Sequence, residues 1–306
     1  MRITHNFLRR KRKQLTPNNV AETKFLMSVK KLVKKQLKLP KEPTIEDILN
    51  SLDKIDLTGL LKKSNILAEE VLRKNSKGFS SIMQALVAAA DTQEKIKKAK
   101  RQEELFKKAL GNFTRQKQIY QPLLNKFNEN IQLIKNLPKD IADELQAAYL
   151  KGEGFRGQDI ESLLEERLGK RARVIIRTES SKLNSALTEV RSEALGIKGY
   201  IWSSSGDSVV RPSHNLVNGV LFFYNDPPSL DKMTGNAGEY PNCRCCPIPV
   251  FDLDDITFPV RVGEHLVVIS KYDKATKKYK AQIVYGRIVT YTKEQFINKY
   301  SIRRVK

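Results

Sequence analysis

Two short stretches set the character of this chain: Asp207-Ser208-Val209-Val210-Arg211-Pro212-Ser213-His214 and Pro241-Asn242-Cys243-Arg244-Cys245-Cys246. All three cysteines of the protein and one of its three histidines lie in them, at the two ends of one loop-rich segment. Thiols and an imidazole brought together can hold a metal ion or lock a small fold. We therefore expect the region from Arg177 to Cys246 to identify the function, rather than the long helical half before it.

The candidate metal ligands are His214, Cys243 and Cys245, and zinc is the metal that suits them. A Cys-x-Cys spacing is less specific than paired Cys-x-x-Cys motifs, and the fourth ligand stays open between Asp207, Cys246 and water. A cluster of thiols and imidazole without any metal is the alternative. Because the thiols are so close in sequence, a disulfide framework explains them poorly.

The net charge of +22 on 306 residues is the second strong signal. Such an excess repels itself in a compact protein unless a partner supplies negative charge, so we expect a polyanion or an acidic protein surface. A lysine-rich surface that only contacts solvent is the alternative. Aromatic residues do not alternate with the basic cluster near the N-terminus, so DNA contacts would be limited to phosphates. The candidate contact residues are Arg9, Arg10, Lys11, Arg12, Lys13, Lys30, Lys31, Lys34 and Lys35.

Membrane and secretory signals are missing from the sequence. No secretory signal is found in residues 1–13, and no apolar run approaches the roughly 18 residues that a membrane span needs. We expect a protein made in a reducing cytoplasm, without stable membrane insertion.

The fold class predicted from the pattern is α+β. A predominantly helical N-terminal region precedes a small α+β domain and a β-rich C-terminal tail. The helical spacing of apolar residues over 22–39 predicts a basic amphipathic helix, and Thr44 with Asp47 predicts the N-terminal cap of the next helix. The expected division is a basic arm at 1–20, a helical domain at 21–150, a signature domain at 151–250 and a β-rich extension at 251–306.

Within the signature domain, three glycines between residues 151 and 157 interrupt the helical pattern. We predict a short helix over 158–168, a long helix over 170–195 that ends at Gly196, strands over 200–202 and 220–224, and a long loop over 226–242. Farther on, 260–270 and 279–291 predict a hairpin or small sheet, and 293–299 a last short helix.

Arg177, Glu179 and Asn184 lie on the predicted long helix. Arg177 and Asn184 are two turns apart and share a face, so we expect them to form hydrogen bonds with a loop packed on the helix rather than to act in catalysis. Phosphate-binding loops, dinucleotide-binding glycine motifs, zinc-protease motifs and hydrolase nucleophile elbows are absent from the sequence. A motor or a standard hydrolase is therefore not expected.

Taken in order, these residues resemble the signature of the phage Mu F-like head morphogenesis family, over about residues 154–250. The matching positions are Arg177, Thr178, Glu179, Asn184, Gly196, Trp202, Asp207, Arg211, His214, Gly219 and Pro241 to Cys245. Cys246 is an extra cysteine, which leaves open which thiols pair with His214. The resemblance implies a minor head protein of a tailed bacteriophage, present in few copies in the virion near the portal vertex, with no reaction of its own.

Three hypotheses of function follow from the residues and the resemblance. In the first, the chain is a structural protein that contacts the portal, the major capsid or scaffold protein, and the phosphates of double-stranded DNA during packaging or ejection. The second is a metal-dependent nuclease or hydrolase with His214 as base and Arg177 or Arg211 on a phosphate, although Asp207 and Glu179 are the only carboxylates on offer. In the third, the basic helix associates with a membrane during DNA ejection.

Overall fold

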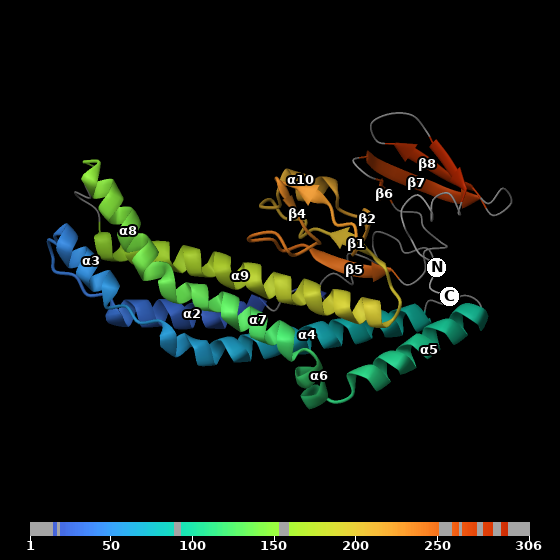
Figure 1. The fold of residues 1–306 in the computed structure, drawn as a ribbon, viewed down its shortest axis with the longest axis horizontal. Coiled ribbons are helices and arrows are strands. Elements are labelled where there is room, and N and C mark those ends of the chain that lie inside the picture. Colours follow the sequence, from blue (N-terminus) through green and yellow to red (C-terminus); the bar gives the residue numbers. More distant parts are fainter. Residues whose placement is uncertain are drawn as a thin grey trace.

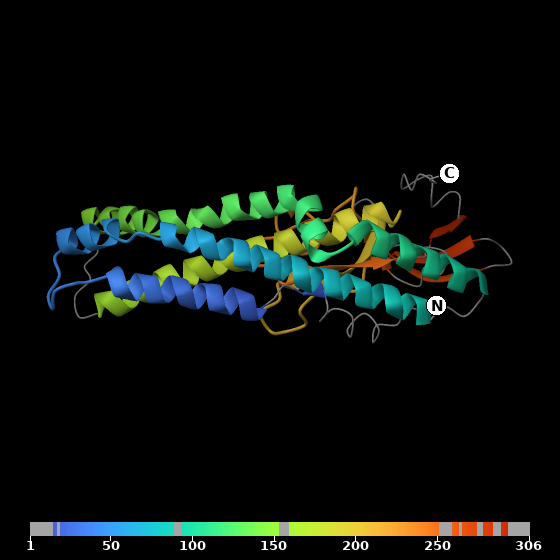
Figure 2. The same cartoon turned by 90° about the horizontal axis from the view of Figure 1, so that it is seen from below.

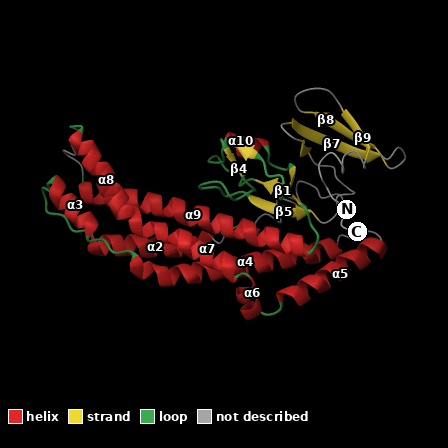
Figure 3. Cartoon of the chain, viewed as in Figure 1, coloured by secondary structure: helices red, strands yellow, loops and turns green. Residues whose placement is uncertain are grey.

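The chain folds as an α+β protein, as predicted. A computed structural model describes residues 15–16, 19–88, 93–152, 159–250, 259–262, 265–273, 278–283 and 289–292. Long helices run along the molecule, and the strands gather on one side of them, over the C-terminal half of α9 and beyond its end (Figures 1 and 3). The helices are α2 (Asn19–Gln36), α3 (Ile45–Asp53), α4 (Leu61–Ala88), α5 (Gln93–Leu110), α6 (Phe113–Ile119), α7 (Gln121–Ile131), α8 (Leu137–Leu150), α9 (Ile160–Ala194) and α10 (Pro212–Leu216), with 3-10 turns η1 (Thr58–Leu60) and η2 (Gln132–Asn136).

Local signals explain where several helices begin and end. Thr44 caps α3 through a reciprocal pair of bonds: its hydroxyl accepts from the Asp47 backbone N–H at 3.1 Å, and its own N–H donates to the Asp47 carboxylate at 2.9 Å. Pro122 stands in the first turn of α7 and separates it from α6. Gly196 follows α9 with a φ of 71°, the left-handed conformation expected of a C-terminal cap.

The prediction of two helices between residues 158 and 195 was wrong, because α9 is one helix of 35 residues. Gly169, near the predicted break, lies inside the helix, where a glycine costs only about 1 kcal/mol relative to alanine. The side chain of Lys30 from α2 lies over it, so that an added Cβ would come within 2.9 Å of the lysine Cε. Packing against α2 therefore holds the helix continuous where local propensity alone would have interrupted it.

One hydrophobic core joins α9 to the helices before it. Buried residues from Phe25 to Ile197 form a single cluster that crosses residue 151, and α9 contacts α2, α4, α7 and α8. The helices lie along the same long direction when the molecule is turned (Figure 2). A second hydrophobic cluster, around Trp202, Phe222 and Tyr240, includes Cys243 and Cys245. The long helix is thus shared between the helical region and the segment that contains the cysteines.

The strands form a seven-stranded sheet in the order β5-β1-β2-β6-β7-β8-β9. The first three are β1 (Gly199–Ser203), β2 (Leu221–Phe223) and β5 (Cys246–Val250), and β1 pairs antiparallel with both others. β6 (Pro259–Val262) joins β2 in parallel, and the antiparallel strands β7 (His265–Asp273), β8 (Lys278–Ile283) and β9 (Val289–Thr292) continue the sheet. The predicted strands over 200–202 and 220–224 are confirmed, the predicted runs over 260–270 and 279–291 each contain parts of two strands, and β5 was not predicted. The predicted loop over 226–242 contains a short hairpin of β3 (Ser229–Leu230) and β4 (Met233–Thr234).

Some predicted features lie outside the described residues. These are the basic arm up to residue 14, including Arg9 to Lys13, most of the predicted glycine-rich break, at 153–157, and the last helix over 293–299. Among the described helices, none is both long enough and apolar enough to cross a membrane.

A buried arginine, Arg191, is the centre of a hydrogen-bond network in the helical region. Arg191 on α9 has only 2% of its surface exposed, and no carboxylate in the described part of the chain is paired with it. Its guanidinium donates to the Asn75 amide oxygen, to the Ser76 hydroxyl at 2.7 Å and to the Tyr120 hydroxyl at 3.3 Å, and it lies over the Tyr120 ring. Neutral acceptors and a ring face stabilise this charge, and burial lowers the pKa of Arg191.

We expect Arg191→Ala to lower the free energy of unfolding by about 3–5 kcal/mol, because it leaves a cavity and buried acceptors without a donor. Urea denaturation followed by circular dichroism measures the loss. Lys170→Ala is the control on the same helix: it removes only an exposed pair with Glu166 and should cost about 0.5 kcal/mol. Equal losses for the two variants would contradict a structural role for the Arg191 network.

Candidate functional site

The cysteines and the histidine predicted to meet do meet, at the edge of the sheet. His214 lies on the short helix α10, which begins at Pro212, a favoured first-turn residue. Asn242 adopts a left-handed φ of 52°, which turns the chain just before Cys243. Cys246 then starts β5, paired with Ser203 at the end of β1.

The three ligand atoms are close together and shielded from solvent. The Sγ atoms of Cys243 and Cys245 each lie 3.5 Å from Nδ1 of His214, and all three atoms are within 4.8 Å of one another. All three residues are buried. Cys246 is buried too but lies outside this group, so the thiols that face His214 are those of Cys243 and Cys245.

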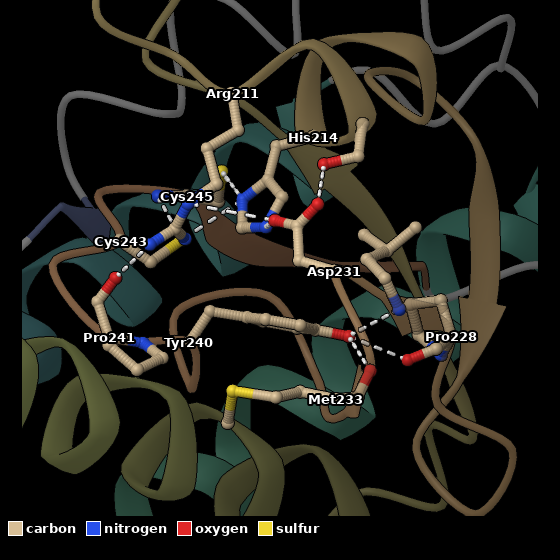
Figure 4. A network of polar contacts seen from close by, with 11 residues as sticks. Arg211, His214, Pro228, Asp231, Met233, Tyr240, Pro241, Cys243 and Cys245 are labelled. Atoms are coloured by element: carbon tan, nitrogen blue, oxygen red, sulfur yellow. Dashed lines mark hydrogen bonds and ion pairs between the residues drawn. The ribbon is translucent and has the colours of Figure 1, made fainter.

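Aromatic rings and a carboxylate fix the imidazole of His214. The rings of Trp202 and Tyr240 meet it edge-on, at centroid distances of 5.3 and 4.8 Å. On the side away from the thiols, a carboxylate oxygen of Asp231 lies 3.4 Å from Nε2 (Figure 4). Sequence reasoning missed Asp231, because it lies in the β3–β4 hairpin and no motif spacing marks it. Its φ of 51° and its bond from the Ser213 hydroxyl at 2.7 Å show that the turn aims it at α10.

The charged residues of the signature hold the cysteine loop rather than line an open site. Arg211 donates to the Pro241 carbonyl at 2.8 Å, and the Asp207 carboxylate accepts from Arg244 at 2.7 Å. Arg177 donates to the Asn242 side chain at 3.3 Å, as expected of a helix residue that binds a loop. These three bonds join two segments, the loop over 207–211 and helix α9, to residues 241–244.

Two small side chains on α9 bind the same loop: Thr178, which belongs to the signature, and Ser181, which the motif analysis did not select. The Thr178 hydroxyl accepts from the Asn242 N–H, and the Ser181 hydroxyl donates to the Cys243 carbonyl, both at 2.8 Å. Gly238 also needs this close approach: an added Cβ would be 3.2 Å from the Ser181 carbonyl oxygen, and its φ of 97° disfavours other residues. No sequence signal beyond their small size distinguishes Ser181 and Gly238.

Two further signature residues, Glu179 and Asn184, lie away from the cluster. Glu179 accepts from Asn130 at 2.6 Å and from Lys182 at 3.0 Å. Asn184 donates to the Leu15 carbonyl at 2.6 Å and accepts from Asn75 at 2.9 Å, so its partners belong to the N-terminal segment and α4 rather than to the loop. Both residues therefore tie α9 to the helical region. Of the other two, Trp202 is fully buried in the second core, and Gly219 has a positive φ of 84° that suits a tight turn.

The two thiols differ in their readiness to lose a proton. The hydrogen bond with Cys245 lowers the pKa of Cys243, and the same bond together with burial raises the pKa of Cys245. The backbone N–H of Cys245 also donates to the Cys243 sulfur at 3.3 Å, which favours a thiolate there. The cluster thus provides one good thiolate, an adjacent thiol and an oriented imidazole.

A second titratable group lies beside the cysteine loop, in a pocket of about 280 Å³ between α2 and α9. Glu22 lines it together with Arg173 and Arg177. Burial raises the pKa of Glu22 to about 7, and the nearby charges of Arg177, Lys74 and Arg244 oppose the rise. The carboxyl is therefore partly protonated in the folded protein near neutral pH.

Since the folded pKa of Glu22 is above the ordinary value of 4.5, its favourable contribution is complete below pH 4.5 and is lost as the pH rises through 7. We expect the free energy of unfolding to fall by up to about 3 kcal/mol over that interval. Glu22→Gln should remove this fall and make the protein more stable than wild type at pH 8, as measured by urea denaturation at pH 4.5 and 8. Glu42→Gln, the same change at an exposed position, should leave the fall in place; a Glu22→Gln profile that matches wild type would contradict the assignment.

Comparison with known proteins agrees with the signature read from the sequence. A relative from Haemophilus influenzae described as an uncharacterized protein is 38% identical over 151 residues, which cover 47% of this chain and 32% of the relative. The chain therefore spans about a third of the length of that relative. No solved structure matches. Residues 139–248 match the family described as Phage Mu protein F like protein, and this match includes α9, the histidine and the whole cysteine loop. Over residues 139–248 the chain is thus similar to the Mu F-like family of phage proteins.

Proposed function

We propose that the chain is a minor head protein of a tailed bacteriophage that acts at the portal vertex during head assembly and stays in the virion. The observation that carries this is the family match over residues 139–248, which contains the loop held by α9, Arg211 and Asp207. In this proposal the loop and sheet are a rigid unit, and the helical region provides the contacts to the portal and to the major capsid or scaffold protein.

The outer face of α2 supports such contacts. Lys31, Lys34 and Lys35 are exposed, and none of them forms an ion pair within the described part of the chain. Val20 and Met27, two turns apart on the same helix, are 64% and 63% exposed. Unpaired cations beside exposed apolar side chains suit an acidic protein surface or DNA phosphates. Lys30 differs from its neighbours, since it lies over Gly169 and beside Glu166.

The nuclease hypothesis finds little support in the geometry. A metal-dependent nuclease needs carboxylates around its metal, but Asp207 is bonded to Arg244, and Glu179 to Asn130 and Lys182. Within the described residues, the metal-binding group around His214 contains no carboxylate. We therefore propose a role without turnover.

Purified phage particles provide the direct test of the proposed location. Mass spectrometry of particles assembled from the genome that encodes this chain should detect it in few copies relative to the major capsid protein. It should also co-purify with the portal after the capsid is disrupted. Particles that lack the chain, or a portal fraction that lacks it, would contradict the proposal.

Phosphate contact by α2 is tested by the salt dependence of DNA binding. We expect the triple variant Lys31→Ala, Lys34→Ala and Lys35→Ala to bind duplex DNA more weakly. Its slope of log affinity against log salt should be about 2–3 units shallower than that of wild type, since each lost phosphate contact removes about 0.9. The control is the same triple change at the exposed Lys97, Lys100 and Lys108 of α5. Fluorescence anisotropy measures both slopes, and an equal change in the control would refute a specific role for α2.

A further inference from the structure

We infer that His214, Cys243 and Cys245 form a zinc site, with Asp231 as the residue that positions His214. The site goes beyond the proposed role in the phage head and does not depend on it. Water, or a group from a partner protein, would take the fourth coordination position, because no fourth ligand comes from the described residues.

The distances are those of a tetrahedral metal site. With Zn–N near 2.0–2.1 Å and Zn–S near 2.3 Å, tetrahedral angles place the ligand nitrogen and sulfur about 3.6 Å apart. Both Sγ–Nδ1 distances are 3.5 Å. The same geometry needs two sulfurs about 3.8 Å apart, and the sulfurs of Cys243 and Cys245 lie within 4.8 Å. Zinc therefore fits with little movement of the backbone.

Hydrogen bonding alone explains the arrangement less well. The Nδ1 atom of a neutral imidazole has one lone pair and accepts from one thiol, yet two thiols lie at the same distance from it. A cation between the three atoms satisfies both sulfurs and the nitrogen together. Two thiolates also cancel the charge of Zn²⁺, so the occupied site is neutral and suits its burial next to Trp202 and Tyr240.

Asp231 lies where a metal-binding histidine usually has a carboxylate partner. Metal-binding histidines usually donate the other ring N–H to a carboxylate, which fixes the tautomer. Asp231 faces Nε2 at 3.4 Å, on the side of the ring opposite the thiols, although Nε2 forms no hydrogen bond in the structure. In the zinc site that we propose, the proton is on Nε2, which leaves the Nδ1 lone pair for the metal. Arg211, at 3.6 Å from Asp231, and the Ser213 hydroxyl hold the carboxylate in place.

The site would join α10 to the start of β5 across 29 residues of chain. These residues include the β3–β4 hairpin and have little secondary structure to order them. Because a loop of this kind rarely preforms a metal site in the unfolded chain, binding of zinc contributes directly to folding. The metal is thus a structural brace for the signature domain.

The experiment measures metal in the full-length chain, purified from cells grown with added zinc and without chelator. We expect about one zinc per chain by elemental mass spectrometry, and cobalt exchange should give a thiolate-to-cobalt charge-transfer band with tetrahedral visible bands. Cys243→Ser and Cys245→Ser should lose the metal and the band. Cys246→Ser is the matched control, because it removes a buried neighbouring thiol outside the cluster and should keep both.

Two further measurements test the zinc site even if a variant of a ligand residue fails to fold. Strong chelators should lower the melting temperature of the wild-type chain and expose Cys243 and Cys245 to a thiol reagent, and added zinc should reverse both effects. Asp231→Asn should keep the zinc but bind it about 10–100-fold more weakly in competition with a chromogenic chelator, and Asp231→Glu should recover part of the loss. Wild-type protein without zinc and without the cobalt band overturns the site, and unchanged affinity in Asp231→Asn overturns the role of Asp231.

Discussion

The structure depends on close packing of chain segments against both sides of α9. One side buries Leu164, Leu168 and Leu187 in the helical core. The other side carries small polar residues, Ser181 and Ser185 among them, so the backbone near Gly238 comes within contact distance of the helix. Larger side chains there would push the loop away and separate the thiols from His214. The small size of the side chains on this face of α9 therefore controls the geometry of the cysteine cluster.

The sequence predicted the elements whose causes are local. Apolar spacing predicted α2, the Thr44–Asp47 pair predicted the start of α3, and Gly196 predicted the end of α9. It failed where tertiary contacts overrode local preference: α9 continues through Gly169 because Lys30 and the rest of α2 pack along it. The strands over 200–202 and 220–224 were predictable, whereas β5 and the parallel pairing of β2 with β6 depend on the path of the chain in space.

The candidate site was predictable in part for a similar reason. Cys243, Cys245 and His214 are of residue types that commonly bind metal ions, so their identity and order in the sequence were enough to select them. Asp231 and Ser181 act through position alone, in a turn and on a helix face, and residues of these types are common in any sequence. Which carboxylate faces the imidazole depended on the left-handed turn at Asp231, and nothing in the local sequence distinguishes that turn from its neighbours.

The uninterrupted length of α9 fixes the distance between the two regions that pack on its ends. A helix of 35 residues spans about 50 Å at 1.5 Å per residue, and its N-terminal part packs on α2 while its C-terminal part holds the cysteine loop. No joint in the helix allows these two ends to move independently. A partner that binds the lysine face of α2 therefore also determines how far away, and in which direction, the sheet is presented to the next component of an assembly.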